Sequence, residues 1–278
     1  MPDGKSLLLS DGVHSLPDGA LARPLQLQGV VAAVDPSGKL AVTAFKENLL
    51  LWDIASGRKL LDCSGSLNPQ AQAAFSPDGT RFVSSGDRFA RVWDVKTGAC
   101  IHKLKKHEGQ TIKARFSPDG SKILSLADGD YQVKTWDASA GAELTAVTMF
   151  AHEGGAPWMD MPHDAAWSID GANIVAGSCT LSVWDAATGR NVTEIGGDGG
   201  HFSSVAMHPD GKTCIAAVFH MDGDAVSMVV LRAIDLAGVQ VTAELQVEAA
   251  TDLRLTLDGA RLVAQAVDTV DVYEIALD

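Results

Sequence analysis

Three residues in the middle of the sequence could do nucleophilic chemistry if the fold brought them together. His107, Ser125 and Asp130 supply an imidazole, a hydroxyl and a carboxylate, which are the groups that activate the nucleophile of serine hydrolases. The short motifs that usually accompany hydrolytic chemistry are absent, because the sequence contains neither G-x-S-x-G nor H-E-x-x-H. His152-Glu153 matches only the first two positions of the second motif. The trio by itself is therefore weak evidence for catalysis.

Other residues that could hold a metal or act as a base are dispersed along the chain. The candidates are four histidines: His152, His163, His201 and His220. Two acidic motifs, Asp128-Gly-Asp130 and Asp222-Gly-Asp224, lack the spacing of a calcium-binding loop and are expected to be turns. The sequence contains no glycine-rich phosphate loop. We therefore expect no catalytic residue, no metal and no cofactor.

The elements that must position these side chains are short β-strands. Residues 71–98 read as strand, tight turn, strand, loop, strand and tight turn. Ser76-Pro77-Asp78-Gly79 has the composition of a turn, because proline fixes φ and glycine tolerates a positive φ. Gly98 is expected to close a second hairpin in the left-handed conformation. Three such strands cannot bury a core alone, so the unit needs copies of itself beside it.

The copies are present as a repeated Trp-Asp pair. The pairs stand at Trp52-Asp53, Trp93-Asp94, Trp136-Asp137 and Trp184-Asp185. The intervals between them are 41, 43 and 48 residues, and a glycine follows each tryptophan by five residues. A period of about 40–45 residues that ends in Trp-Asp is the signature of a four-stranded propeller blade. Over nearly its whole length the sequence resembles the WD40-repeat family.

The resemblance implies an all-β fold, a WD40-type β-propeller, formed by residues 1–278 as a single domain. Five units are complete, near 30–66, 70–107, 110–150, 162–199 and 202–247, and units at 1–28 and 249–278 are incomplete.

Two ways of closing the propeller are compatible with these units. In the favoured one there are seven sectors, with incomplete first and last units. In the alternative there are six blades, and residues 1–20 form an extra hairpin. Leu21 to Gln28 could supply the outer strand of the last blade. Because the chain opens on a turn, we expect it to be a fragment of a longer protein.

The same resemblance gives the His–Ser–Asp trio a structural interpretation. Members of the family often have a buried hydrogen-bond network within a blade, and the third unit matches it best through His107, Ser125, Asp130 and Trp136. An indole N–H bonded to a buried hydroxyl stabilises a blade. We therefore expect these residues to be structural rather than catalytic.

Composition restricts the class of partner. The net charge is −13, which argues against nucleic acid or an anionic membrane, because both are bound by excess lysine and arginine. The only basic cluster, Lys103 to His107, is expected to be the solvated edge of an outer strand. Four dispersed cysteines suggest neither a disulfide nor a zinc site and are consistent with a reducing, cytoplasmic setting: Cys63, Cys100, Cys179 and Cys214.

Two departures from the repeat predict where a partner binds. The connection at 150–162 and the loop at 219–228 are both long. They come from neighbouring units and should emerge on one face, which in repeat proteins is commonly the binding face. Trp158 has no place in the repeat and is a candidate aromatic anchor; alternatively it folds back over the channel mouth or blade four. The predicted partner-binding residues are Trp158, Met159, Asp160, Met161, His152, His220, Met221, Asp222 and Asp224.

The resulting expectation is a non-catalytic scaffold for protein–protein interaction, with a protein or peptide partner that carries a basic segment. Two alternatives remain open. The first is a propeller hydrolase, or a small-ligand or metal binder, that uses the channel mouth. The second is the sensor portion of a multidomain kinase or NTPase regulator.

Overall fold

The computed structural model describes most of the chain, and every regular element in the described part is a β-strand. The described residues are 1–3, 5–15, 20–64, 72–86, 88–105, 107–127, 130–149, 162–196, 199–222, 225–247, 252–255, 261–265 and 270–274. Their contacts separate into two compact units, one formed by residues 1–130 with 134–144 and the other by residues 131–133 with 145–278.

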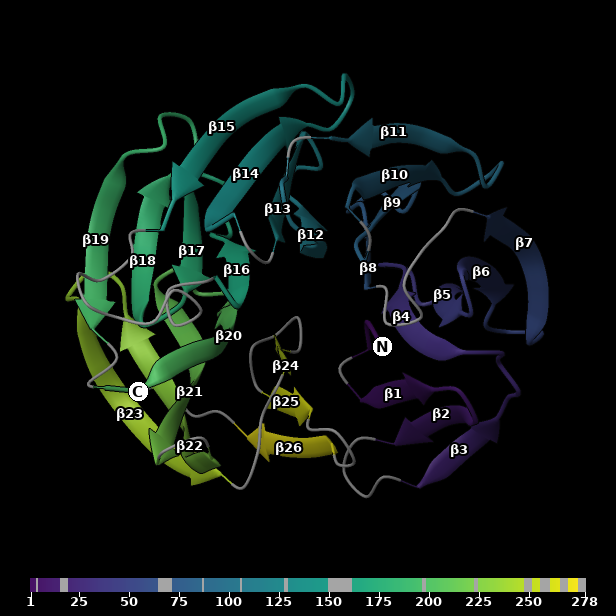
Figure 1. The fold of residues 1–278 in the computed structure, drawn as a ribbon. Coiled ribbons are helices and arrows are strands. Elements are labelled where there is room, and N and C mark those ends of the chain that lie inside the picture. Colours follow the sequence, from purple (N-terminus) through teal and green to yellow (C-terminus); the bar gives the residue numbers. More distant parts are fainter. Residues whose placement is uncertain are drawn as a thin grey trace. The chain divides into compact units, whose positions relative to one another are not determined.

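The strands form antiparallel sheets in chain order (Figure 1). An N-terminal sheet contains β1 (Ser6–Leu9), β2 (Gly12–Ser15) and β3 (Leu21–Pro24). Blade 1 follows with β4 (Val30–Val34), β5 (Leu40–Phe45), β6 (Asn48–Asp53) and β7 (Arg58–Ser64). Blade 2 contains β8 (Ala73–Phe75), β9 (Arg81–Ser84), β10 (Ala90–Asp94) and β11 (Cys100–Leu104). Blade 3 contains β12 (Thr111–Phe116), β13 (Lys122–Ala127), β14 (Gln132–Asp137) and β15 (Glu143–Thr148).

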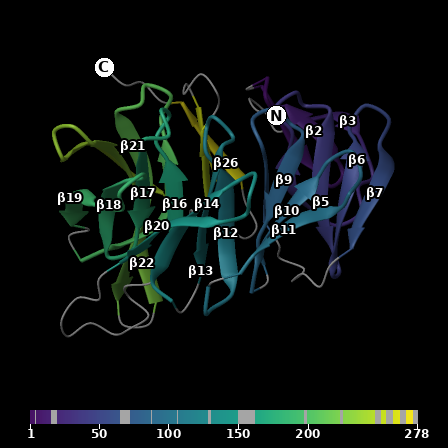
Figure 2. The ribbon, with the colours of Figure 1, turned by 90° about the horizontal axis from the view of Figure 1, so that it is seen from above.

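The second half of the chain repeats the arrangement. Blade 4 contains β16 (Asp164–Trp167), β17 (Asn173–Gly177), β18 (Thr180–Asp185) and β19 (Asn191–Gly196). Blade 5 contains β20 (His201–Met207), β21 (Thr213–Asp222), β22 (Ala225–Asp235) and β23 (Gln240–Val247). A C-terminal sheet contains β24 (Asp252–Leu255), β25 (Arg261–Gln265) and β26 (Val270–Glu274). The first strands of neighbouring blades lie side by side, as β4 and β8 do (Figure 1) and as β16 and β20 do (Figure 2).

The fold is an all-β propeller, as the sequence predicted. The five four-stranded blades and the C-terminal sheet give the six blades of the alternative interpretation, with the hairpin β1–β2 preceding them. The seven-sector interpretation stays a prediction. One expectation about closure is corrected: Leu21–Pro24, proposed as the outer strand of the last blade, pairs with β2 and is the outer strand of the N-terminal sheet. Leu8, Val13 and Leu27 hold this segment to blade 1 by packing with Trp52 and Ile54.

The hairpins after the Trp-Asp pairs have the predicted conformation. Gly98 has a φ of 70° and its N–H donates to the carbonyl of Asp94 at 2.9 Å. The Asp94 carboxylate accepts from the backbone N–H of Thr97 at 2.8 Å and from its hydroxyl at 2.7 Å. A positive φ favours glycine because it has no Cβ, and a short carboxylate is suited to accept from a nearby backbone amide. The repeated Asp and Gly are therefore turn residues.

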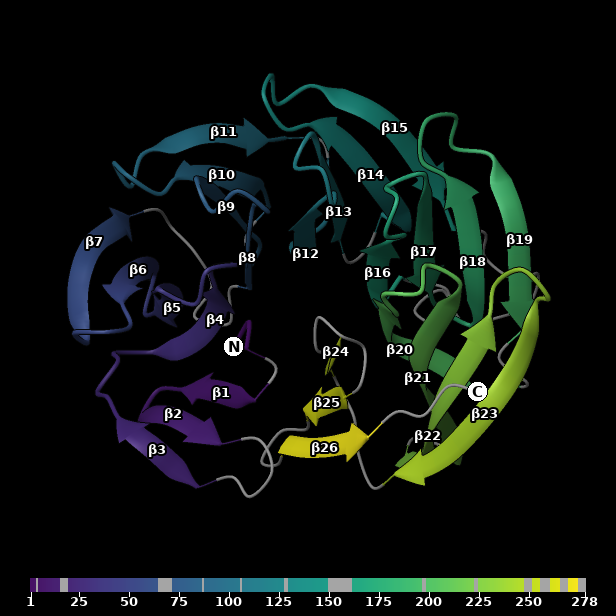
Figure 3. The same ribbon diagram turned by 180° about the vertical axis from the view of Figure 1, so that it is seen from behind.

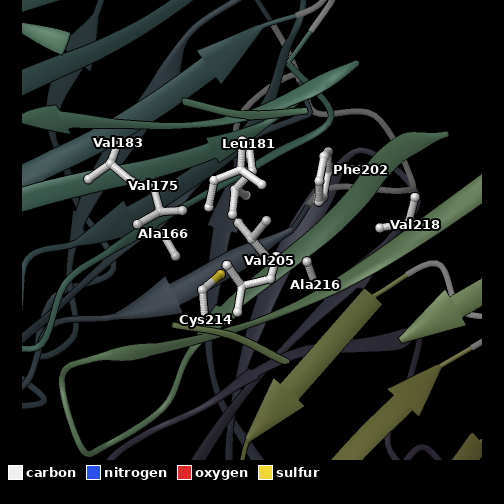
Figure 4. Close-up of a cluster of buried hydrophobic side chains, with 11 residues drawn as sticks. Ala166, Val175, Leu181, Val183, Phe202, Val205, Cys214, Ala216 and Val218 are labelled. Carbon is white, nitrogen blue, oxygen red and sulfur yellow. The ribbon is translucent and has the colours of Figure 1, made fainter. Parts of the chain in front are cut away.

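Pairs of blades bury continuous apolar cores between them. Figure 4 shows one in the second unit, which contains Leu181 and Val183 of β18 together with Phe202 and Val205 of β20. The Asp164 side chain adds a polar contact between these blades, because its fully buried carboxylate accepts from the Ser204 hydroxyl at 2.7 Å and from the Val205 N–H at 3.1 Å. This packing holds blades 4 and 5 together, and the candidate site lies at the ends of their strands.

The predicted loop at 219–228 is instead a hairpin extension. β21 continues to Asp222 and β22 begins at Ala225, with Phe219 paired to Val229 and Met221 to Val226. In β21, Phe219 and Met221 alternate with His220 and Asp222, which is the period-2 pattern of a strand. The insertion therefore lengthens blade 5 rather than adding a flexible loop.

Candidate partner-binding face

The His–Ser–Asp trio is joined by hydrogen bonds in the interior of blade 3. His107 Nδ1 lies 2.6 Å from Asp130 Oδ2, and His107 Nε2 lies 2.7 Å from Ser125 Oγ. The indole N–H of Trp136 donates to the same Ser125 oxygen at 2.8 Å. These are the four residues that the resemblance assigned to a structural network.

Burial and the additional indole donor distinguish this trio from an accessible Ser-His-Asp triad. An indole N–H can only donate, so Ser125 Oγ accepts from Trp136 and its own O–H donates to His107 Nε2. The Nδ1–H of His107 then donates to the Asp130 carboxylate. The Ser125 and His107 side chains are fully buried, and the Asp130 side chain is 4% exposed. The Ser125 oxygen is therefore shielded from solvent and bonded on both sides.

Blades 1 and 2 contain the first link of the same network. The Trp52 indole donates to the Thr43 hydroxyl at 2.9 Å, and the Trp93 indole donates to the Ser84 hydroxyl at 2.9 Å. Both hydroxyls are fully buried, so each satisfies a donor that would otherwise be costly to bury. In blade 4 the corresponding residue is Ala176, two residues after the one that pairs with Trp184.

A different group of side chains lies in the second unit, close in sequence to the two long connections. Phe219 of β21 is half-buried and its ring stacks on His201 with centroids 5.1 Å apart. The ring of His163, the residue before β16, meets the same phenyl edge-on at 6.0 Å. Two imidazoles from neighbouring blades therefore share one aromatic side chain.

The surrounding residues hold this group in place. His201 is buried, and its Nδ1 lies 3.4 Å from the Cys179 sulfur. The backbone N–H of His163 donates to the Gly177 carbonyl at 2.9 Å. Burial, and then the neighbouring His201, lower the pKa of the His163 imidazole from its ordinary value. His163 is therefore neutral at pH 7.

Glycine allows a third histidine to approach the same edge. A Cβ at Gly200 would lie 2.8 Å from Cε1 of His220 and 2.6 Å from Cγ1 of Val218. Such distances are too short for a real side chain, so a larger residue at this position would displace the His220 ring. His163, His201 and His220, proposed as alternative metal ligands or bases, thus approach one edge of the unit.

The described residues contain no group of three His, Cys, Asp or Glu side chains arranged to ligate a metal ion. In the same described part, no helix is long and apolar enough to cross a bilayer. The four cysteines are free thiols. Burial raises the pKa of Cys63 to about 11, and burial together with Asp164 raises the pKa of Cys214 to about 12.

The predicted partner-binding residues are divided by the limits of the described chain. His220 and Met221 are half-buried in β21, and Asp222 is exposed at its end. The others lie outside the described residues: His152, Trp158, Met159, Asp160, Met161 and Asp224. The sequence reasoning missed Phe219, although an aromatic residue directly before His220 in an unusually long hairpin was a usable signal.

A family comparison agrees with this geometry. The model described as "WD domain, G-beta repeat" matches residues 62–94 and 98–137, which extend from the end of β7 through β14. A comparison with curated proteins finds no match. The other blades share the strand order, and blades 1 and 4 share the Asp–Gly hairpin of the matched repeats. The matched repeats are therefore similar to WD40 repeats, and the blades that flank them have the same four-stranded antiparallel order.

Proposed function

We propose that the protein is a non-catalytic, cytoplasmic scaffold that binds a protein or peptide through one face. This face, called the partner face below, consists of the connection 150–162 and the extended hairpin 219–228. One observation carries the proposal: the ring of His163, next to the end of the connection, lies 6.0 Å from Phe219 in the hairpin. Because the residue after one insertion contacts the first residue of the other, the two insertions can present one continuous surface.

The chemistry of the partner follows from the residues of these segments. Asp222 is exposed at the tip of β21, and Asp160 and Asp224 stand in the same two segments. Trp158, with Met159 beside it, supplies an aromatic anchor and an adaptable neighbour. A partner segment with lysine or arginine beside an apolar residue fits this combination. Because this recognition would depend on opposite charges, added salt should weaken binding.

The test is a quantitative binding experiment with the full chain. Partners captured by the parent protein are identified, and the affinity of each is measured again with Trp158→Ala. Loss of a buried aromatic anchor should cost about 2 kcal/mol or more, which is about thirtyfold in Kd. Ile169→Ala is a matched control, since Ile169 is 47% exposed in the turn at the opposite end of β16. It should bind with parent affinity.

Two results would refute the partner face. The first is that Trp158→Ala retains every partner at parent affinity. The second is that it melts as badly as Trp93→Ala, an unfolding control whose indole is buried; Trp158 would then be a structural residue that covers the blade.

The alternative of a metal-dependent or small-ligand site rests on the histidines that approach the same edge. Metal analysis of the purified protein separates the two functions. Stoichiometric zinc, iron or calcium that is lost from His163→Ala would favour the alternative over the scaffold. Metal-free protein that still binds its partner would favour the scaffold.

A further inference from the structure

The four cysteines lie in different chemical environments, and Cys179 faces an imidazole. Cys63 and Cys214 are fully buried, and burial raises their pKa values to about 11 and about 12. Cys100 is half-buried, burial raises its pKa, and its thiol donates to a backbone carbonyl at 3.4 Å. Cys179 is half-buried as well, but its sulfur lies 3.4 Å from Nδ1 of His201. The thiol of Cys179 therefore has a base beside it.

The turn between β17 and β18 carries Cys179 and is fixed to blade 5. The Ser178 carbonyl accepts from the Phe202 N–H at 2.7 Å, and the Ser178 N–H donates to the Thr180 carbonyl at 2.9 Å. Strands β17 and β18 both contact β20, which begins at His201 (Figure 3). The hydrogen bond from Phe202 therefore brings the turn next to the histidine that precedes Phe202.

Glycine at the start of this turn permits the close approach. A Cβ at Gly177 would lie 2.5 Å from the Cβ of Phe202, which is too short for two real side chains. Glycine allows a backbone to approach a neighbour this closely because it has no Cβ. A larger residue at this position would push the turn away from β20 and separate the sulfur from the imidazole.

The imidazole of His201 is held in one orientation. His201 is 7% exposed, and its ring stacks on Phe219 with centroids 5.1 Å apart and an interplanar angle of 24°. Rotating the ring would break this stack, so Nδ1 stays directed at the Cys179 sulfur. A proton can then move from the thiol to Nδ1, which leaves a thiolate beside an imidazolium. The thiolate is the nucleophilic form of cysteine, and a neighbouring imidazolium stabilises it.

We propose that Cys179 is a redox-active thiol that a hydroperoxide oxidises reversibly to a sulfenic acid, with His201 as its acid–base partner. The thiolate sulfur attacks one oxygen of the peroxide, so that an S–O bond forms and the O–O bond breaks. The imidazolium of His201 gives its proton to the leaving hydroxide, and hydrogen peroxide therefore yields water. The sulfur loses two electrons and the peroxide gains them. A thiol reductant returns the sulfenic acid to the thiol.

The position of the sulfur favours a small oxidant. Cys179 is half-buried in a short turn that is bonded to the next blade, so hydrogen peroxide has easier access than a bulky disulfide, and access is part of thiol reactivity. The leaving hydroxide also needs a proton, which His201 can supply across the 3.4 Å contact. Both features point to a hydroperoxide as the substrate.

This inference goes beyond the proposed scaffold function and does not depend on it. Cys179 and His201 lie outside the two segments that define the partner face, and no binding partner enters the test. Failure of one proposal therefore leaves the other standing.

The test treats the full chain with hydrogen peroxide in the presence of a metal chelator, and then with dimedone, which labels sulfenic acids. Mass spectrometry of the peptides locates the label, and Cys100 is an internal control because it is also half-buried. An ordinary cysteine is only a few per cent thiolate at pH 7, and a less basic thiolate is a weaker nucleophile, so we expect Cys179 to be labelled about fivefold faster than Cys100. A thiol reductant added before dimedone should abolish the label.

His201→Phe tests the imidazole, because phenylalanine keeps a ring that can stack on Phe219 and removes both nitrogens. Labelling of Cys179 should slow about fivefold. The ultraviolet absorbance of the thiolate should also be lost, as it should be in Cys179→Ser. His208→Phe is the matched control, since His208 follows the opposite end of β20; it should label within about twofold of the parent. Thermal melting checks the fold, and His201→Gln replaces His201→Phe if the latter unfolds.

Four outcomes would overturn the proposal. Equal labelling of Cys179 and Cys100 would show that the imidazole confers no reactivity. An unchanged rate in a folded His201 variant would exclude His201 as the acid–base partner. No label on Cys179 of the parent would exclude the sulfenic acid. A label that persists when the reductant precedes dimedone would exclude reversible oxidation.

Discussion

Arg81 ties blade 2 to blade 3 through a hydrogen bond to Ala138. Its Nη1 donates to the Ala138 carbonyl at 2.7 Å, and its Nη2 donates to the Gly120 carbonyl at 3.3 Å. The guanidinium also lies 5.5 Å from the centroid of the Phe116 ring. One side chain on β9 thus satisfies two turns of the next blade and covers an aromatic core residue.

Arg81→Met should therefore destabilise the protein by about 2 kcal/mol, because it removes charged donors from two carbonyls and keeps most of the apolar stem. Urea unfolding monitored by tryptophan fluorescence measures the change. Arg58→Met is the control, since Arg58 is exposed on β7 and should alter the free energy of unfolding by less than about 0.5 kcal/mol. Equal effects from the two variants would show that the bonds of Arg81 contribute nothing.

Ser125→Ala should cost more than Ser84→Ala. Removing the Ser125 hydroxyl leaves both the Trp136 indole and the His107 imidazole without that partner, whereas removing the Ser84 hydroxyl affects only Trp93. An unsatisfied buried group costs about 1–3 kcal/mol, so we expect about 2 kcal/mol or more against about 1 kcal/mol. Chemical denaturation of both variants makes the comparison. A larger loss of stability in Ser84→Ala than in Ser125→Ala would contradict the hydrogen-bond chain through Ser125.

Gly98→Val should destabilise the first unit. A β-branched residue resists the φ of 70° at this position, and its Cβ would also meet the Cys63 sulfur at 3.4 Å. The strain should cost about 1–3 kcal/mol. Gly98→Asn is the matched variant, because asparagine tolerates a positive φ better than valine does. Both melting temperatures are measured, and an unchanged value for Gly98→Val would refute the strain argument.

The aspartate carboxylates in the turns should make the free energy of unfolding fall as the pH drops below about 4. Hydrogen bonds from Ser117, and then from the N–H and hydroxyl of Ser121, lower the pKa of Asp119 to about 2. In the unfolded chain the pKa of aspartate is about 3.9, so the unfolded state binds the proton first. The stabilisation is complete above about pH 4 and is lost as the pH falls toward 2. In Asp119→Asn, urea midpoints measured across this range should fall less steeply than in the parent.

The parts of the fold that could be predicted from the sequence are local. The turn at Ser76 to Gly79 depends on neighbours in the chain, and its Gly79 N–H donates to the Ser76 carbonyl at 2.9 Å. The spacing of the Trp-Asp pairs likewise predicted the positions of the third strands, because each blade repeats one local pattern. Residues of the blade-3 hydrogen-bond chain were identified through resemblance and spacing.

What sequence reasoning missed depends on contacts between distant residues. Arg81 is an ordinary strand residue until Ala138 is placed beside it. Phe219 becomes part of a site only because His163 and His201 arrive from other strands. The strand Leu21–Pro24 was misassigned because strand patterns do not identify the edge with which a strand pairs.

The alanine at position 176, where other blades have a hydroxyl, affects which part of the chain is expected to unfold first. Thr43, Ser84 and Ser125 each hold an indole in the first unit, whereas alanine has no hydroxyl with which to do so in blade 4. Local unfolding follows such differences in stability, so a protease should cut within residues 145–278 before it cuts the first unit. The second unit, which contains the proposed partner face, is then also expected to change conformation at the lower free-energy cost, and a ligand bound there would act by shifting that equilibrium.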